Sequence, residues 1–382
     1  MPILKRPGVY YNEDVTYELV GEGSKIPVFI GVSGNTETTG YKVDGTQINK
    51  YTNWEAVNKS TSEGGVGVYE EGTTNELLKT LYEFFEEGAI QKVEDIGVPY
   101  IYVIDVGDGK QSTSWLTAAK LSKTKRDATI EAIIGQENVT SVSPTALVKS
   151  LQASVITETH SLNLRNLFVR LPTNTVSELL TYTNDTNNLR LKRLGLCEKH
   201  LFGKTIARIC CTPYYKEPGF YTYRSVEEGE FIERTAEEEL ALQNAGIIFN
   251  RDEHINGKVY PKINLCVSTS FAKPIGSRDA DALFHARFNS DSLLREVFEV
   301  CYSQIKANES ATNLAYLQTR LNKIVNDRVA AEDFIKYDEK TETGTKLVVN
   351  QSDADPYSLI ITGQMHPQKC TVAIEVEATV KI

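Results

Sequence analysis

The stretch Pro99-Tyr-Ile-Tyr-Val-Ile-Asp-Val106 is apolar at almost every position. A strand with one face in water alternates apolar and polar residues, whereas a strand covered on both faces is apolar nearly throughout. We therefore expect this stretch to lie inside a sheet that carries helices on both sides.

A helix is predicted shortly before this strand, because apolar side chains recur there at helical spacing. These side chains are Leu77, Leu78, Leu81, Phe84 and Phe85. Thr74 is a suitable N-cap and Gly88 a suitable C′ residue for this helix. The sequence thus pairs an amphipathic helix with a buried strand, which is the repeating unit of α/β folds.

Strands and helices alternate along the rest of the first 280 residues. Further strands are predicted at 28–31, 128–134, 167–171, 205–211 and 247–250. Helices are predicted at 144–159, at 176–183, and from Thr235, which stands three residues before Glu238 as in a capping box. Residues 34–73 are rich in glycine and threonine and are interpreted as loops with one short helix. This order favours an α/β sandwich with a largely parallel sheet.

The character of the chain changes near residue 280, where two apolar helical stripes follow each other. The stripes are Leu293, Leu294, Val297, Val300 and Cys301, and then Leu314, Leu317, Leu321, Ile324 and Val325. We predict an N-terminal extended arm at 1–25, an α/β core at 26–280, a mainly helical C-terminal domain at 281–368, and a C-terminal β-arm at 369–382.

The segment 370–382 has the most regular pattern in the chain. Every second residue is apolar: Cys370, Val372, Ile374, Val376, Ala378, Val380 and Ile382. This period of two predicts one strand through the whole segment, with a length of roughly 40 Å. A typical strand has only about five or six residues. Such a strand suits pairing with something outside its own domain, although a long edge strand of the C-terminal domain is the alternative.

The N-terminal segment is also rich in β-forming residues, among them Val9, Tyr10, Tyr11, Val15 and Tyr17. It is set off by Gly21-Glu22-Gly23-Ser24 before the first predicted core strand. We interpret it as an arm, and the alternative is a first strand of the core sheet.

Composition excludes several function classes. The formal net charge of −10 argues against a nucleic-acid binder, which needs a basic face. The apolar runs are too short for a membrane span, and the N-terminus has no apolar segment of a secretory signal. We expect the chain to fold in a cytoplasm, with its six cysteines as reduced thiols because none has CxxC spacing.

The sequence contains no recognisable motif of catalysis or ligand binding. The five histidines stand apart from cysteines and from catalytic partners. Gly107-Asp-Gly109-Lys110 follows a buried strand but lacks the length of a phosphate loop and the Ser/Thr after the lysine, so we interpret it as a turn. We therefore predict no enzyme activity, no catalytic residue, no cofactor and no metal site.

Several short motifs, in order, resemble contractile-tail sheath proteins of bacteriophages and related injection machines. They are Pro7-Gly8-Val9-Tyr10 followed by Glu13, Phe29-Ile30-Gly31, Phe84-Phe85 with Gly88, Tyr100-Ile-Tyr-Val-Ile104, and Phe231-Ile-Glu-Arg-Thr235 with Glu238, Leu242, Ala245 and Gly246. The resemblance covers most of the chain, and residues 34–73 depart from it most.

The resemblance implies a structural subunit in stacked hexameric rings around an inner tube, forming a helical assembly in a virion tail or an extracellular contractile particle. The particle would assemble in a bacterial or archaeal host cytoplasm and also contact a baseplate and a tail terminator. Arms of neighbouring subunits would add strands to a C-terminal domain, with 20–25 and 362–369 as flexible stems. The arm residues include Val9, Tyr10, Tyr11, Val15, Tyr17, Val372, Ile374, Val376 and Val380.

The resemblance also implies that a C-terminal helix contacts the tube. Our candidate is 312–329, where Arg320, Lys323 and Arg328 lie off the apolar stripe; an ordinary solvated helix face is the alternative. Other functions left open are a tail-tube, terminator or other virion component, an injection-system subunit, and a small-molecule α/β enzyme or binding protein. Neither nucleic acid nor direct membrane insertion is expected.

Overall fold

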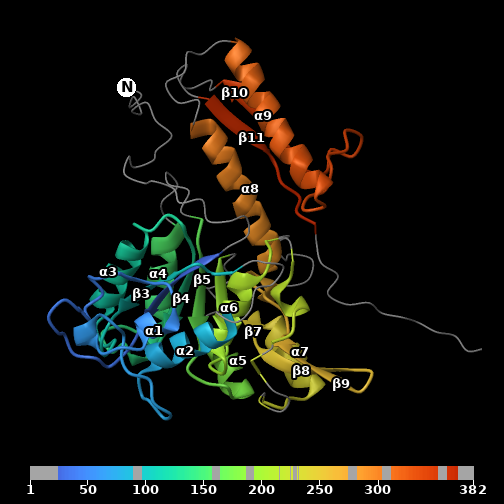
Figure 1. Ribbon diagram of the computed structural model, residues 1–382. Helices are drawn as coiled ribbons and strands as arrows, with labels where there is room; N and C mark the ends of the chain where they lie inside the picture. Colours follow the sequence, from blue (N-terminus) through green and yellow to red (C-terminus); the bar gives the residue numbers. More distant parts are fainter. Residues whose placement is uncertain are drawn as a thin grey trace, which may run out of the picture. The chain divides into compact units, whose positions relative to one another are not determined.

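The computed structural model describes the chain from Lys25 to Gln368 with internal gaps (Figure 1). The gaps are residues 89–96, 157–163, 186–192, 215, 224, 227–229, 231, 274–281, 303–310 and 352–358. The described chain forms two compact units, one extending to Arg287 and the other starting at Phe288. We call them the α/β unit and the C-terminal unit.

The α/β unit is built on a seven-stranded sheet in the order β2-β3-β1-β4-β5-β6-β7. Its strands are β1 (Ile26–Gly31), β2 (Asn49–Tyr51), β3 (Ile101–Asp105), β4 (Ala128–Ile134), β5 (Asn166–Arg170), β6 (Leu194–Cys197) and β7 (Ile247–Ile248). All neighbours pair in parallel except β2, which runs antiparallel to β3. The predicted α/β sandwich with a largely parallel sheet is confirmed.

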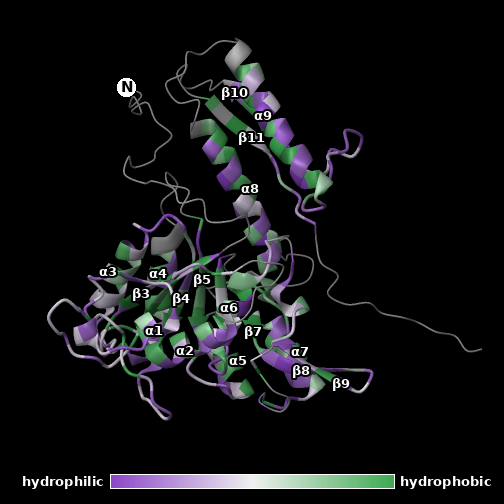
Figure 2. Ribbon diagram, viewed as in Figure 1, coloured by the Kyte–Doolittle hydropathy of each residue, from purple (hydrophilic) through white to green (hydrophobic). Residues whose placement is uncertain are grey.

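Helices cover both faces of this sheet. One layer contains α3 (Ser112–Ser122), α4 (Pro144–Ile156), α5 (Val176–Asp185) and α7 (Ala236–Asn244). The other contains α2 (Glu76–Gly88) and α6 (Phe202–Cys211), with the short α1 (Trp54–Val57) beside α2. The strand residues are accordingly buried throughout β1, β3, β4, β5 and β6, and Figure 2 shows their hydrophobic colour in the middle of the unit.

Short elements complete the α/β unit. A hairpin of β8 (Asn250–Ile255) and β9 (Lys258–Ile263) follows β7. The 3-10 turns are η1 (Thr61–Glu63), η2 (Gln136–Asn138), η3 (Pro218–Phe220) and η4 (Thr269–Ala272). None of the described helices is long and apolar enough to span a membrane.

The close packing of α2 against α6 depends on a glycine. A Cβ placed on Gly203 would lie 2.1 Å from the carbonyl oxygen of Thr80, so any larger residue would force the two helices apart. The Gly203 N–H donates to Glu83 Oε2 at 2.9 Å, and the buried pair Arg208–Glu87 joins the helices further along. Burial raises the pKa of Glu83 to about 7, against the lowering effects of the Gly203 N–H and of nearby cations.

The predicted strand at 205–211 is wrong, because this segment is the helix α6. Every residue of α6 is buried, and Lys204 and Arg208 are neutralised by Glu86 and Glu87 of α2. Lys204 and Arg208 stand four residues apart, a helical spacing that was a usable signal for α6. The prediction instead followed the apolar and β-branched residues of the segment, which also suit a buried strand. Within the seven-stranded sheet, the strands that the sequence analysis missed are β2 and β6.

Helix boundaries differ from the predictions in small ways. Asn75, not Thr74, caps α2, since its Oδ1 accepts the N–H of Leu78 at 2.8 Å. The capping box of Thr235 and Glu238 at the start of α7 is confirmed, with both reciprocal hydrogen bonds present. The loop-rich segment 34–73 contains a short strand, β2, besides the short helices.

The C-terminal unit contains most of α8 (Phe284–Tyr302), then α9 (Ala311–Ala330), β10 (Lys346–Gln351) and β11 (Leu359–Gln364). Its core is small and unites both predicted helical stripes with the hairpin. It consists of Leu293, Val297, Leu317, Leu321, Val325, Phe334 and Leu347. Along α9, hydrophobic and hydrophilic residues alternate as expected for a helix with one buried face (Figure 2).

Candidate assembly surface

The β10–β11 hairpin is the part of the C-terminal unit that could accept a further strand. Its two strands pair antiparallel over six residues each, from Lys346 opposite Gln364 to Gln351 opposite Leu359. One face, which includes Leu347, Val349 and Ile361, packs on the helices. A two-stranded sheet is only marginally stable alone, so this packing holds the hairpin in place.

The two outer edges of the hairpin differ. In an antiparallel pair, every second residue directs its backbone N–H and C=O away from the partner strand. On β10 these groups include the Leu347 C=O, which accepts from the Gln318 side chain of α9, and the Val349 N–H, which donates to it. The opposite residues on β11 are Gly363 and Ile361, whose outward groups have no partner among the described residues. As far as the described residues go, the β11 edge could therefore accept another strand.

An exposed stripe on α9 contains two of the three predicted tube-contact residues. Arg320 and Lys323 are exposed, one turn apart on the face opposite the core. Tyr316, which is 49% exposed, precedes them on the same stripe, and its hydroxyl accepts from Arg320 Nη1 at 3.3 Å. The sequence analysis missed Tyr316, although its spacing of four residues from Arg320 was a usable signal.

Arg328 lies on a different side of α9 and is bound within the unit. Its Nη2 donates to Asn289 Oδ1 at 2.7 Å, its Nε lies 3.1 Å from Asp333 Oδ2, and its Nη1 lies 3.5 Å from Glu296 Oε1. Burial raises the pKa of Asp333, and the Arg328 charge opposes this rise. The guanidinium of Arg328 thus joins α8, α9 and the segment after α9.

The two predicted flexible stems are not supported where the structure describes them. Residues 362–364 belong to β11, and the following residues are fixed by hydrogen bonds from Ile335 N–H to His366 O and from Gln368 N–H to Asp333 O. At the other end, Lys25 is fully buried and its ammonium donates to Ile209 O at 3.1 Å. Burial lowers the pKa of Lys25 to about 8.

Both predicted arms lie outside the described residues. This applies to the N-terminal residues Val9, Tyr10, Tyr11, Val15 and Tyr17, and to the C-terminal residues Val372, Ile374, Val376 and Val380. Their pairing stays a prediction.

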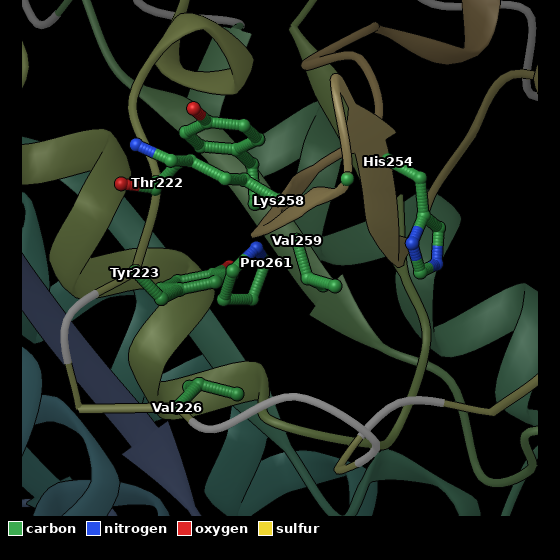
Figure 3. A pocket seen from close by; sticks show the side chains of 9 residues that line it. Thr222, Tyr223, Val226, His254, Lys258, Val259 and Pro261 are labelled. Atoms are coloured by element: carbon green, nitrogen blue, oxygen red, sulfur yellow. The ribbon is translucent and has the colours of Figure 1, made fainter.

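Among the described residues, no group of three or more His, Cys, Asp or Glu side chains is placed to hold a metal ion. A hollow of about 630 Å³ lies beside the β8–β9 hairpin, lined by side chains that include Tyr223, His254 and Lys258 (Figure 3). The Tyr223 hydroxyl is already engaged, since it donates to Asn250 Oδ1 at 2.7 Å.

Burial raises the pKa of Cys210 and Cys266 well above the usual thiol range, which makes these thiols poor nucleophiles. We find no reactive constellation here.

A scan against protein-family models finds no match, and a search of curated proteins finds none. Solved structures match along the whole chain. A protein of the anti-feeding prophage (AFP) baseplate matches with a TM-score of 0.65 and 14% identity over 100% of both chains. The AFP helical sheath in its contracted state matches with a TM-score of 0.64 and 12% sequence identity over 99% of both chains. The sheath tail protein from Desulfitobacterium hafniense matches with a TM-score of 0.55 and 7% sequence identity over 94% of this chain and 100% of that chain.

These matches include both units of the chain, since they extend over nearly its full length. The likeness is one of structure, because sequence identity is low in each case. The resemblance inferred from short motifs is confirmed at this level: the chain has the fold of contractile tail sheath proteins.

Proposed function

We propose that this protein is a structural subunit of a contractile tail sheath. The observation that carries the proposal is the match to a helical sheath in the contracted state over 99% of both chains. Subunits would polymerise as stacked hexameric rings around an inner tube, and contraction would drive the tube through a target envelope. The free energy that drives contraction would come from contacts between subunits that become larger on contraction, and the subunit would catalyse no reaction.

The hairpin edge supports this role physically. Addition of a strand to an open sheet edge joins two proteins through main-chain hydrogen bonds, which tolerate a change in the relative position of their rigid bodies. We assign the arms 1–25 and 369–382 to such links between subunits. The open edge of β11 is a suitable receiver for one of them.

The exposed α9 stripe is our candidate for the tube contact. Tyr316 and Arg320 are of residue types that are enriched at protein interfaces, and Arg320 and Lys323 together provide two cations suited to an acidic partner. Arg328 would support this helix from inside the unit. Baseplate contact is supported by the match to a baseplate structure, and we place the protein in a virion tail or extracellular contractile particle.

The decisive experiment is negative-stain microscopy of the purified protein, alone and with its tube protein. We expect hollow cylinders with a helical repeat. Deletion of residues 370–382 should abolish the cylinders while the fluorescence of Trp54 and Trp115, both in the α/β unit, stays native. A monodisperse monomer at high concentration, even with tube protein present, would refute the sheath role.

The tube contact has its own test. Replacing Arg320 and Lys323 by glutamate should weaken co-sedimentation with an acidic tube by about tenfold or more at low salt, because charge reversal at an interface turns attraction into repulsion. Lys336→Glu with Lys340→Glu, at two exposed lysines elsewhere in the same unit, is the matched control with the same change in net charge. Equal effects of both changes would mean that net charge, and not this stripe, governs binding.

A further inference from the structure

A buried lysine lies directly before the first strand of the sheet. None of the surface of Lys25 is exposed, which is rare for a lysine. Its ammonium donates to the carbonyl oxygen of Ile209 at 3.1 Å and to that of Thr212. The ring centre of Tyr214 lies 5.0 Å from the same nitrogen, a distance that allows a cation–π contact. The side chain of Lys25 therefore holds the chain, just before β1, to the segment that ends α6.

The C-terminal end of α6 is a suitable place for this cation. The last carbonyl groups of a helix have no partner within the helix, and the helix dipole favours a positive charge beside them. The helix itself is firmly held, because all its residues are buried and because Lys204 and Arg208 pair with Glu86 and Glu87 of α2. Lys25 is thus bonded to an element that is fixed on several sides.

The first residues of β1, in contrast, are weakly hydrogen-bonded to the sheet. The ladder between β1 and β3 starts at Val28, whereas Ile26 and Pro27 pair with β4 alone. The register to β4 shifts between Ile26 and Pro27, and Pro27 has no N–H to donate. A pull on the chain before Lys25 would load these residues first, so the ladder would resist it poorly.

We propose that Lys25 is the mechanical anchor of the N-terminal arm. A pull on residues 1–24 is resisted by the bonds of the Lys25 ammonium to the end of α6 before it reaches the weakly bonded start of β1. This inference rests on the proposed sheath function, in which residues 1–25 link subunits, and it names the residue at which the load enters the α/β unit. Lys25 is a positioning residue, since it acts through α6.

The same side chain contributes little to equilibrium stability. Transfer of an ammonium into the interior is unfavourable, and burial lowers the pKa of Lys25 to about 8, against the opposing effects of nearby thiols and of Glu217. Methionine has a stem of similar length without a charge to desolvate. In Lys25→Met, the loss of the hydrogen bonds is therefore offset by relief from desolvation, and urea unfolding should change little. A directed pull has no such compensation, because only the bonds of Lys25 connect this point of the backbone to α6.

Single-molecule force measurements on the full-length chain test the anchor. In the first arrangement, handles at the N-terminus and at the exposed Lys258 pass the load through residue 25. In the second, handles at Lys258 and at the exposed Lys59 load the α/β unit without passing through residue 25. Lys25→Met should shorten the lifetime under constant load about tenfold or more in the first arrangement, because hydrogen bonds from a charged group are lost. The lifetime in the second arrangement should stay at the parent value.

Two further variants control this result. Lys204→Met makes the same change at another buried lysine, on α6 itself, and removes its pair with Glu86. It should affect both arrangements alike. Tyr214→Leu removes the aromatic ring but keeps the hydrogen bonds, and it should shorten the lifetime about threefold in the first arrangement only. This variant serves if Lys25→Met fails to fold.

The outcomes separate the anchor from the sheath function. Equal shortening in both arrangements by Lys25→Met would show that Lys25 stabilises the unit as a whole, which overturns the anchor. An unchanged lifetime in the first arrangement would overturn it as well. If microscopy of the parent shows cylinders in either case, the sheath function stands. A lifetime that depends on the direction of the pull, in a protein that forms no cylinders, supports the anchor and refutes the sheath function alone.

Discussion

The α/β unit and the C-terminal unit bury their β-sheets in different ways. In the first, helices cover both faces of seven strands, and even charges are paired inside, as in Arg165–Glu131, where both side chains are fully buried. In the second, two helices cover one face of a two-stranded hairpin, and one of its edges has no partner within the part of the chain that the structure describes. The α/β unit thus covers both faces of its sheet with its own helices, and the C-terminal unit covers one face of its hairpin.

The largest effect is expected inside the α/β unit. Arg165→Met leaves the Glu131 carboxylate buried without its cation, and breaking a buried pair in this way costs about 3–5 kcal/mol. Urea unfolding followed by tryptophan fluorescence measures the loss, because both tryptophans lie in this unit. The double variant Arg165→Met with Glu131→Gln should recover part of the stability. A double variant no better than the single would show that the unpaired charge is not the cause.

The next effect should be confined to the C-terminal unit. Leu321 is fully buried in its core, so Leu321→Ala should cost about 2–4 kcal/mol there. We expect far-UV circular dichroism to show an earlier transition while tryptophan fluorescence unfolds as in the parent. Leu240→Ala, at a leucine that is 57% exposed, should change neither signal noticeably. If fluorescence and circular dichroism shift together in Leu321→Ala, the two units unfold as one.

The smallest effect concerns pH and the α2–α6 contact. The pKa of Glu83 is raised from 4.5 to about 7, so the folded state holds a proton that the unfolded state has already released between these values. The contribution of Glu83 to the free energy of unfolding is therefore greatest below pH 4.5, and it decreases as the pH rises towards 7. Glu83→Gln should remove that slope and raise Tm by about 1–3 °C at pH 8.

Thermal unfolding at pH 5 and pH 8 measures the difference between the parent and the Glu83→Gln variant. Glu71→Gln, at an exposed position, is the control and should keep the parent's slope. An unchanged slope in Glu83→Gln would mean that Glu83 is ionised in the folded protein throughout this range.

Much of the α/β unit could be predicted from local pattern. Parallel strands covered on both faces are apolar without interruption, which is why β3 and β4 were found, and the Thr235–Glu238 capping box fixed the start of α7. The same logic failed for α6, because its apolar residues were read as a buried strand although Lys204 and Arg208 recur at helical spacing.

The candidate assembly surface could be predicted only in part. Arg320 and Lys323 were identifiable as polar positions off an apolar stripe, but the same reasoning gave Arg328 the same role. The structure separates them, because Arg328 meets Asn289 and Asp333, which are distant in sequence.

The sequence by itself determined the fold class, the two apolar stripes of the C-terminal unit and the alternation of residues 370–382, because each depends on the order of side chains along a short segment. Tertiary structure alone decided that Gln318 reaches Leu347 and Val349, and that the outward backbone groups of β11 have no partner among the described residues. These depend on which backbone groups already have partners, and hydrogen bonding between distant segments leaves no periodic trace in the sequence.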